Sequence, residues 1–454
     1  MNFILPKIKE LTDPEEIKGY LQRPEEDTSM VLKTVMDVID GIRKRGDSAL
    51  EEFIKKYDGF DTSIKEIRVK EDEISSVAAR VQEERPELIR ALAVSRKNIQ
   101  EYHSAQLKNG EGQWMIGVGT GREVGQKVTP IGRVGLYIPG GRYAYPSTLL
   151  MAAIPAMTAG VKEMAICSPP DKCGKLNDVL LYLCSELGIK EIYRVGGAQA
   201  VAAMAYGTAT IKKVDKIAGP GNAFVTMAKK MVYGTVGIDS LAGPSDITII
   251  SDASSSPELI AMDLLSQAEH DPLSRSILLS SSKEIALQSV EAICNMLDTF
   301  QEKKEYNENL EVMQSSVRNF CSVFYCSNID IIIETADLIA PEHLEIMVKD
   351  PEYVIDKIQN AGAVFIGNNT PVAVGDYISG TNHVIPTEGN TRFASPLGVG
   401  DFQKRSSICY YSREALEAGK EHIAEISIFE RLYAHRDSVL KRFSYEKTGQ
   451  RTKR

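Results

Sequence analysis

The sequence lacks the features that mark membrane-spanning, secreted and nucleic-acid-binding proteins. It contains no run of about 18 apolar residues, so we expect no segment to cross a membrane. The amino terminus, MNFILPKIKE, has no charged start followed by the apolar core of a secretory signal. With 62 Asp and Glu against 53 Lys and Arg, the net charge is −9, which argues against a nucleic-acid binder. We therefore expect chemistry on small molecules, with no nucleic acid and no membrane as partner.

Cysteine pairs are missing as well. The seven cysteines are scattered and include no CxxC, and an odd number in a long chain does not indicate a disulfide framework. This pattern favours a reducing, cytoplasmic location. The 454 residues are 43 % apolar and 25 % charged, close to the globular average, which excludes disorder as a description of the whole chain. Such a length allows roughly two to four domains.

Four common catalytic motifs are absent from the chain. There is no GxxxxGK[ST] phosphate loop and no GxGxxG dinucleotide fingerprint after a strand. The GxSxG elbow and the HExxH zinc motif are missing too. Any nucleotide must therefore be held by loops of another kind.

What is present is a regular alternation of strands and helices. Residues 31–105 read as helices, because apolar side chains recur at spacings of three and four from Val31 to Ile42. From RVGLYIP to SDITIISD, short apolar runs alternate with helical segments, and a second alternation runs from PELIAMDLLSQAEH to GAVFIGN. Alternation of this kind predicts parallel, doubly wound sheets. The final segment loses the alternation and ends in helices.

Two of the scarce histidines stand beside side chains that bind cations or move protons. Gln267 and His270 lie three residues apart at the end of a predicted helix, so an amide oxygen and an imidazole share one face. Glu342 precedes His343 in APEHLEIM, where we expect a helix start that displays an acid–base pair. The plainer alternatives are a polar helix end with a capping histidine, and an ordinary helix start with a favourable acidic residue.

Two further groups lie nearer the carboxyl terminus. Asp376 follows the strand AVFIGN, and we place it at the carboxyl edge of a sheet, where open α/β sheets bind ligands. A turn aspartate is the alternative. Glu430 and His435 lie in FERLYAHRD, which we expect to form one helix, with the two side chains roughly 140° apart. A solvated helix of mixed charge is the alternative.

Two glycine-containing turns lead from a strand into a helix. They are GGAQAVAAMA, with Gln199, and AGPGNAFVTMAKK, with Asn222. Free N–H groups at such helix starts can bind an anion such as a pyrophosphate, although most turns of this type are only tight turns. Ser245, in LAGPSD, links the two alternating regions at a position where a cleft would open.

Eight segments occur in an order that resembles one known family. They are GRVGLYIPGG, RVGGAQAVAA, KIAGPGNAFVTMAK, AGPSD, DLLSQAEHDP, APEHLE, GDYISGTNHVIPT and a closing E-x-x-x-x-H. The family is that of the histidinol dehydrogenases, and the resemblance extends from about Val31 to about Arg442.

The resemblance implies a zinc-dependent enzyme. It would oxidise L-histidinol to L-histidine through L-histidinaldehyde, the final step of histidine biosynthesis, with two NAD+ reduced in succession. The implied ligands of one zinc ion per subunit are Gln267, His270, Asp376 and His435. The implied acid–base pair is Glu342 and His343. The implied substrate contacts are Ser245, Gln267, His270, His343, Asp376, Glu430 and His435, and those to NAD are Tyr137, Gln199 and Asn222.

The same resemblance implies a homodimer with interwoven tails, in which Glu430 and His435 enter the partner's site. The expected fold is α/β, with two doubly wound, incomplete Rossmann-like domains, a helical N-terminal region and an extended C-terminal tail. We assign residues 1–30 to an arm, 31–136 with 247–385 to a metal-binding catalytic domain, 137–246 to an NAD-binding domain and 386–454 to the tail and its helices.

Some positions depart from the family pattern. Asp246 stands where the family commonly has Glu, and Pro396 and Gly400 replace other small or polar residues. They leave open a paralogous zinc-dependent NAD alcohol dehydrogenase that acts on another small polar alcohol. Glu430 suits a cationic substrate, because an anionic alcohol would require Arg or Lys there. A non-catalytic protein with structural zinc is a third hypothesis, but structural zinc sites favour Cys over Gln and Asp.

Overall fold

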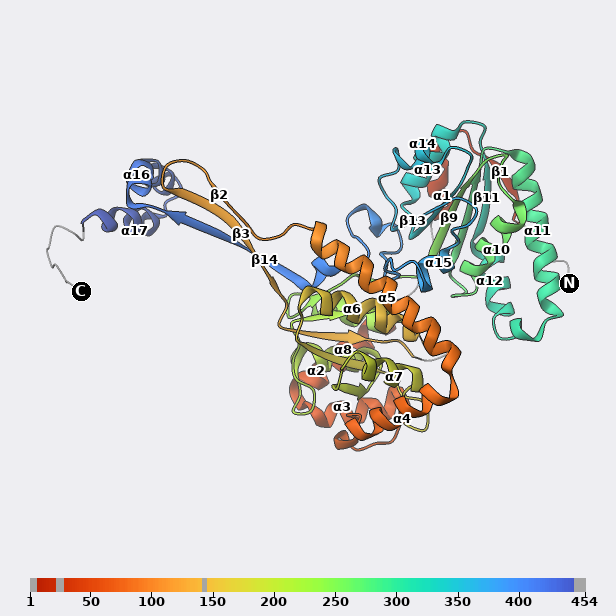
Figure 1. The fold of residues 1–454 in the computed structure, drawn as a ribbon, viewed down its shortest axis with the longest axis horizontal. Coiled ribbons are helices and arrows are strands. Elements are labelled where there is room, and N and C mark those ends of the chain that lie inside the picture. Colours follow the sequence, from red (N-terminus) through yellow and green to blue (C-terminus); the bar gives the residue numbers. More distant parts are fainter. Residues whose placement is uncertain (1–5, 22–27, 141–144, 445–454) are drawn as a thin grey trace. The chain divides into compact units, whose positions relative to one another are not determined.

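The computed structural model describes residues 6–21, 28–140 and 145–444. The chain divides into two units (Figure 1). The larger unit combines Met1–Gln106 with Ile131–Phe402, and the smaller unit combines Leu107–Pro130 with Gln403–Arg454. Within the described ranges, no helix combines the length and the apolar character needed to cross a membrane.

The larger unit contains a six-stranded sheet whose strands all run parallel. In spatial order its strands are β1 (Ile8–Glu10), β11 (Cys321–Tyr325), β10 (Arg275–Ser280), β9 (Asp246–Ser251), β12 (His343–Met347) and β13 (Ala363–Ile366). One face packs on α10 (Pro257–Ala268), α11 (Lys283–Gln301), α12 (Leu310–Phe320) and the short α15 (Val372–Tyr377). The other packs on α1 (Lys18–Leu21), α13 (Ile329–Ile339) and α14 (Pro351–Ile355). Both faces are thus covered, as parallel sheets require.

A second parallel sheet in the same unit has five strands. In spatial order they are β6 (Ile192–Arg194), β5 (Glu163–Ser168), β4 (Arg133–Tyr137), β7 (Lys216–Ala218) and β8 (Gly237–Ile238). Counted along the chain this is the order 3-2-1-4-5, which lacks only the sixth strand of a full doubly wound dinucleotide-binding sheet. Its own helices are α6 (Pro146–Ala159), α7 (Asp178–Glu186), α8 (Gly197–Tyr206) and α9 (Ala223–Val232). The α/β class and the two parallel sheets expected from the sequence are confirmed.

The N-terminal helices cover this second sheet, which differs from the division that we expected. They are α2 (Ser29–Arg45), α3 (Asp47–Phe53), α4 (Glu71–Glu84) and α5 (Pro86–Asn109). The helices α4 and α5 join the core that contains α6 and α7, and α2 and α3 join the core that contains α8 and α9. The physical reason lies in α8, where every residue from Ala198 to Ala205 is buried. A helix that is apolar all round requires a second layer outside it.

The two ends of the chain also differ from expectation. Within the expected arm, Ile8–Glu10 forms an edge strand of the six-stranded sheet, whereas residues 1–5 and 22–27 lie outside the described residues. Residues 386–402 belong to the larger unit, because Leu397 and Phe402 are buried in its core. The tail therefore begins at Gln403 rather than at residue 386.

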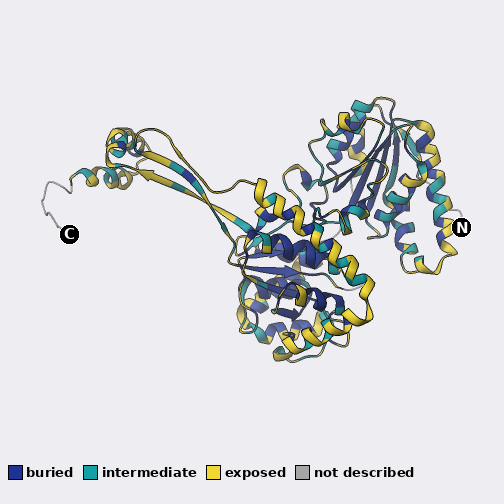
Figure 2. Cartoon of the chain, viewed as in Figure 1, coloured by how far each residue is buried: buried dark blue, intermediate teal, exposed yellow. Residues whose placement is uncertain are grey.

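The smaller unit is an antiparallel ribbon that carries two helices. Its strands, in the order β14 (Gln403–Tyr411), β3 (Arg122–Pro130) and β2 (Trp114–Gly117), come from two distant segments of the chain. The helices α16 (Arg413–Phe429) and α17 (Tyr433–Ser444) follow β14 and pack on each other. Figure 2 shows the strands of both parallel sheets as mostly buried, whereas much of the ribbon is exposed.

Candidate active site

Glu342 and His343 lie at the amino end of β12, not at the start of a helix as the sequence suggested. The preceding helix α13 ends at Ile339, and its capping residue Ala340 has a left-handed backbone with φ 51°. The carbonyl oxygen of Ala340 accepts a hydrogen bond of 2.8 Å from the hydroxyl of Thr391. This turn directs Pro341 and Glu342 straight into a strand between β9 and β13, where a fully buried run such as HLEIM belongs.

His343 is buried and held through one ring nitrogen. Its Nδ1 lies 3.1 Å from the carbonyl oxygen of Asp246 and 3.0 Å from Oε1 of Gln267. Burial lowers the pKa of His343 to about 4, although the nearby carboxylate of Asp376 opposes the shift. The imidazole is therefore neutral at physiological pH, and with Nδ1 engaged, Nε2 is the atom that can accept a proton. A neutral, oriented imidazole is suited to general base catalysis.

Glu342 is fixed by reciprocal hydrogen bonds with Asp246. The N–H of Asp246 donates to Oε2 of Glu342 at 3.1 Å, and the N–H of Glu342 donates to Oδ1 of Asp246 at 3.0 Å. The hydroxyl of Ser245 also hydrogen-bonds the Glu342 carboxyl. Burial, together with the charges of Asp246 and Asp376, raises the pKa of Glu342 well above its usual range. Glu342 is thus a buried carboxyl with a strongly raised pKa, a feature that is common at catalytic sites.

The predicted metal ligands of the larger unit lie at the ends of two helices. Gln267 is the buried penultimate residue of α10, whereas His270 lies beyond the end of that helix and is exposed. Asp376 lies in α15 and acts electrostatically on both Glu342 and His343. The cluster therefore forms at the amino edge of the six-stranded sheet, and the expected position of Asp376 at the carboxyl edge is wrong. The reason is that α15, an element absent from our prediction, leads the chain back along the sheet after β13.

The predicted ligands of the larger unit provide part of a metal-binding donor set. The amide nitrogen of Gln267 is buried without a hydrogen-bond partner. Oε1 of Gln267, which faces Nδ1 of His343 at 3.0 Å, keeps a second lone pair that a cation could use. Among the described residues, no group of three His, Cys, Asp or Glu side chains is arranged as a metal site. Within the larger unit, the predicted ligand set contains two residues of these four types, His270 and Asp376. These two residues, with Gln267, can hold a cation that takes a further ligand from elsewhere.

Glu430 and His435 belong to the smaller unit, in contrast to the other predicted site residues. They do not share a helix: Glu430 caps the end of α16, and His435 lies in α17. Between them Arg431 has a left-handed backbone with φ 59°, which ends the first helix. Both side chains are exposed.

The three residues assigned to NAD line one cavity of about 440 Å³ at the carboxyl edge of the five-stranded sheet. Tyr137 ends β4, and its hydroxyl accepts a hydrogen bond of 3.1 Å from the N–H of Gly197. The side-chain oxygen of Asn222 accepts from the N–H groups of Phe224 and Val225 and so caps α9. Only the amide nitrogen of Asn222 therefore remains to donate to a ligand.

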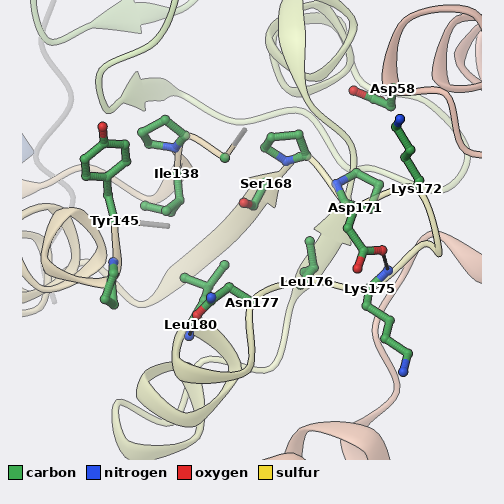
Figure 3. Close-up of a pocket in the computed structure, with 15 residues that line it drawn as sticks. Asp58, Ile138, Tyr145, Ser168, Asp171, Lys172, Lys175, Leu176, Asn177 and Leu180 are labelled. Carbon is green, nitrogen blue, oxygen red and sulfur yellow. Dashed lines mark hydrogen bonds between the residues drawn. The ribbon is translucent and has the colours of Figure 1, made fainter. Parts of the chain in front are cut away.

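A second cavity, of about 550 Å³, adjoins the first (Figure 3). The two share Asp58, Gly140, Pro169 and Pro170. The second lies beyond the end of β5, at Ser168, and Lys172 and Lys175 also line it. In Figure 3 the side chain of Lys172 points toward Asp58, at the opposite end of the cavity from Tyr145. Both cavities thus lie at the carboxyl ends of the strands, where open α/β sheets bind their ligands.

Asp58 was not identified from the sequence. Its Oδ2 accepts hydrogen bonds from the N–H of Gly196 at 3.2 Å and from Nε2 of Gln199 at 3.1 Å. Burial raises the pKa of Asp58 to about 6. Nothing in the local sequence KKYDGF distinguishes this residue from a surface aspartate, because its partners lie about 140 positions along the chain.

The turn before Asn222 is held by a buried ion pair. The ammonium of Lys229 pairs with Asp239 and donates to the carbonyl oxygen of Gly219 at 2.9 Å. The N–H of Gly219 donates to Oδ2 of Asp239 at 2.7 Å. Gly219 has φ 120°, and a Cβ atom there would lie 2.0 Å from the carbonyl oxygen of Tyr137. Only glycine fits this approach of the turn to β4.

These features define an α/β enzyme with two adjoining ligand-sized cavities on one sheet and a buried Glu–His pair on the other. Residues 21–443 match the histidinol dehydrogenase family. The chain belongs to this family, as the sequence motifs indicated.

Individual relatives agree along nearly the whole chain. Histidinol dehydrogenase from Methanothermobacter thermautotrophicus is 42 % identical over 439 residues, which are 97 % of this chain and 99 % of that protein. The enzyme from Clostridium acetobutylicum is 42 % identical over 422 residues, 93 % of this chain and 94 % of that one. A crystal structure of histidinol dehydrogenase from Elizabethkingia anophelis, 35 % identical, superposes with a TM-score of 0.88 and covers 98 % of this chain and 99 % of that chain.

Proposed function

We propose that the chain catalyses the NAD-dependent, four-electron oxidation of L-histidinol to L-histidine through L-histidinaldehyde, the final step of histidine biosynthesis. The observation that carries this proposal is the buried Glu342–His343 pair beside Gln267, found in a member of the histidinol dehydrogenase family. The cofactor is NAD, taken into the cavity lined by Tyr137, Gln199 and Asn222.

A zinc ion would be held by Gln267, His270 and Asp376 and by His435 of the partner subunit. The buried side chain of Gln267 beside His343 and the mixed nitrogen and oxygen donors support this assignment. A zinc ion bound there would supply Lewis-acid polarisation of the substrate oxygen. The absence of Cys from the set favours a catalytic role over a structural one.

Two side chains, His343 and Glu342, carry out different proton transfers. In the first step, Nε2 of His343 takes the hydroxyl proton while the carbon of histidinol transfers a hydride to NAD+. In the second step, Glu342 positions and deprotonates the water that adds to the bound aldehyde, while His343 returns its proton to the carbonyl oxygen and becomes neutral again. His343 then takes the hydroxyl proton of the hydrate as a second hydride leaves to a second NAD+. Glu430 contributes a carboxylate that suits the cationic amine or imidazole of histidinol, and Ser245 contacts the substrate beside Glu342.

The proposed assembly is a homodimer in which each smaller unit completes the partner's site with Glu430 and His435. The smaller unit supports this, because it exposes large apolar side chains along the ribbon and at the end of α16, among them Trp114, Ile116, Ile426 and Phe429. Exposed apolar surface of this extent marks an interaction site. We place the enzyme in the cytoplasm, because all seven cysteines are free thiols.

The test is NADH formation by the purified chain with L-histidinol and NAD+, with and without a chelator. We expect two NADH per histidinol and a loss of activity on chelation that added zinc reverses. No NADH from histidinol in the presence of zinc would contradict the proposal. NADH from another small polar alcohol instead would identify a paralogous dehydrogenase.

A further inference from the structure

We propose that Asp263 and Glu345 form a buried carboxyl pair that shares one proton and positions the three elements carrying Gln267, His343 and Asp376. The positioning role rests on the function proposed above. Neither residue touches substrate or cofactor in this assignment, so both are positioning residues.

Glu345 contacts two other elements, through Val372 and through Asp263. This residue lies in β12 and is only 1 % exposed. Its Oε1 accepts a hydrogen bond of 3.0 Å from the N–H of Val372. Its carboxyl also hydrogen-bonds the carboxyl of Asp263 on α10, and apart from that contact Oε2 is buried with no donor among the described residues. Two carboxyls can form such a contact only if one of them carries a proton.

Asp263, Val372 and Glu345 each share a face of their helix or strand with a residue of the active site. Asp263 precedes Gln267 by one turn of α10, and Val372 precedes Asp376 by one turn of α15, so the members of each couple share a helix face. Glu345 follows His343 by two residues and shares its face of β12. One shared proton therefore connects the strand of His343 with the helices of Gln267 and Asp376.

The pair lies among apolar residues, which indicates that its polar groups have a specific structural role. Leu264, Phe365 and Val372 belong to the apolar cluster around it. Apolar residues of similar volume would pack there at no loss of stability, because buried charged groups lose their hydration. What apolar residues cannot do is fix the direction of the Val372 N–H, and with it the first turn of α15. Burial and the neighbouring carboxyl raise the pKa of Glu345 to about 9, and burial raises that of Asp263 to about 6, in agreement with one retained proton.

The test compares two substitutions of similar size. Glu345→Gln keeps an oxygen for Val372 and provides an N–H for Asp263, so it imitates the protonated pair. Glu345→Met keeps the volume and removes both contacts. We expect wild-type zinc affinity and kcat for Glu345→Gln, and a 10–100-fold loss of zinc affinity for Glu345→Met. The matched control is Glu334→Met, at an exposed position of α13, which should change nothing.

Three measurements separate positioning from general stability. Zinc affinity is measured by competition with a chromophoric chelator, folding by circular dichroism of the metal-free protein, and NAD affinity by titration. Positioning predicts lost zinc affinity with unchanged folding and NAD binding, and rescue by Gln. Equal zinc affinity for wild type and Glu345→Met overturns the proposal, and so does a loss in Glu345→Gln as large as that in Glu345→Met. If Glu345→Met does not fold, Asp263→Leu, at a half-buried position, tests the same contact.

A readout without zinc distinguishes this proposal from the proposed function. Hydrogen exchange at the Val372 amide should be slow in the wild type and in Glu345→Gln, and at least 10-fold faster in Glu345→Met. If the wild type neither binds zinc nor oxidises histidinol, the proposed function fails, and the exchange rates alone decide whether the pair holds α15. Equal exchange rates at the Val372 amide in all variants would contradict the proposal that the pair holds α15.

Discussion

Oδ2 of Asp58 lies 3.1 Å from Nε2 of Gln199, and both side chains line the proposed cofactor cavity. The same oxygen accepts from the N–H of Gly196, at the turn that leads into α8. One carboxylate thus holds both the amide that would contact NAD and the loop that carries it.

The first prediction concerns this contact. Asp58→Asn should lower NAD affinity about 5–30-fold, because losing one such hydrogen bond costs about 1–2 kcal/mol. Since the pKa of Asp58 is about 6, wild-type affinity should also fall as the pH drops through 6, and the variant should not show this fall. NAD titrations at several pH values measure both effects. Asp61→Asn, at a nearby exposed aspartate, is the control, and an unchanged affinity in Asp58→Asn would remove Asp58 from the cofactor site.

The second prediction follows from the proton held by Glu345. Its pKa is raised from 4.5 to about 9 in the fold, so between these pH values the folded state keeps a proton that the unfolded state releases. The free energy of unfolding contributed by this group should therefore fall as the pH rises, by up to about 1.4 kcal/mol per pH unit. Burial raises this pKa most, the charge of Asp263 raises it further, and the N–H of Val372 opposes the shift. Urea unfolding at pH 5, 7 and 9 should show the wild type losing stability relative to Glu345→Gln, and parallel curves would contradict the shared proton.

The third prediction separates the two oxidation steps. Glu342→Gln should slow the oxidation of supplied L-histidinaldehyde more than the first hydride transfer from L-histidinol, because Glu342 is assigned to the hydrating water. His343→Asn should slow both. A positioned general base contributes about 10²–10⁴-fold. Single-turnover NADH formation from each substrate is the measurement, with zinc content as the control. Equal losses in both steps for Glu342→Gln would reject this division.

The fourth prediction concerns sharing between subunits. His435→Ala and His270→Ala should each be inactive, but mixing the two and allowing exchange should restore roughly a quarter of wild-type activity. Half of randomly mixed dimers contain both variants, and each of those has one intact site if His435 acts in the partner. Analytical ultracentrifugation should show a dimer of the 50.0 kDa chain. Proven exchange without recovery of activity would place His435 in the site of its own chain.

Much of the fold could be predicted because the signals are local. The run RVGLYIP gives β4, and the alternation after it gives α6, β5, α7, β6 and α8 in turn. The prediction for Glu342 and His343 was wrong in placing them at the start of a helix, because they lead into β12. Read as a strand, HLEIM would have placed Glu345 beside His343 on one face, so the sequence did contain that signal.

Other features depend on partners that are distant in the sequence. Asp58 looks like any surface aspartate until α8 lies against it, and Ile8–Glu10 is too short to identify before β11 pairs with it. The break between Glu430 and His435 depends on the left-handed backbone of Arg431, which propensity alone disfavours. Position along the chain likewise did not show which sheet the N-terminal helices would cover.

The pairing of β3 with β14 has a consequence for synthesis of the chain. Pro130 pairs with Gln403 and Arg122 with Tyr411, so the ribosome makes the two strands more than 270 residues apart. At about 5–20 residues per second, the β2–β3 hairpin waits roughly 15–60 s for its third strand. During that interval one edge of β3 is open, and an open edge pairs readily with strands of other nascent chains. Production of this protein should therefore respond to translation speed and to chaperones that shield strand edges, and a transcript cut short before residue 403 should yield aggregates.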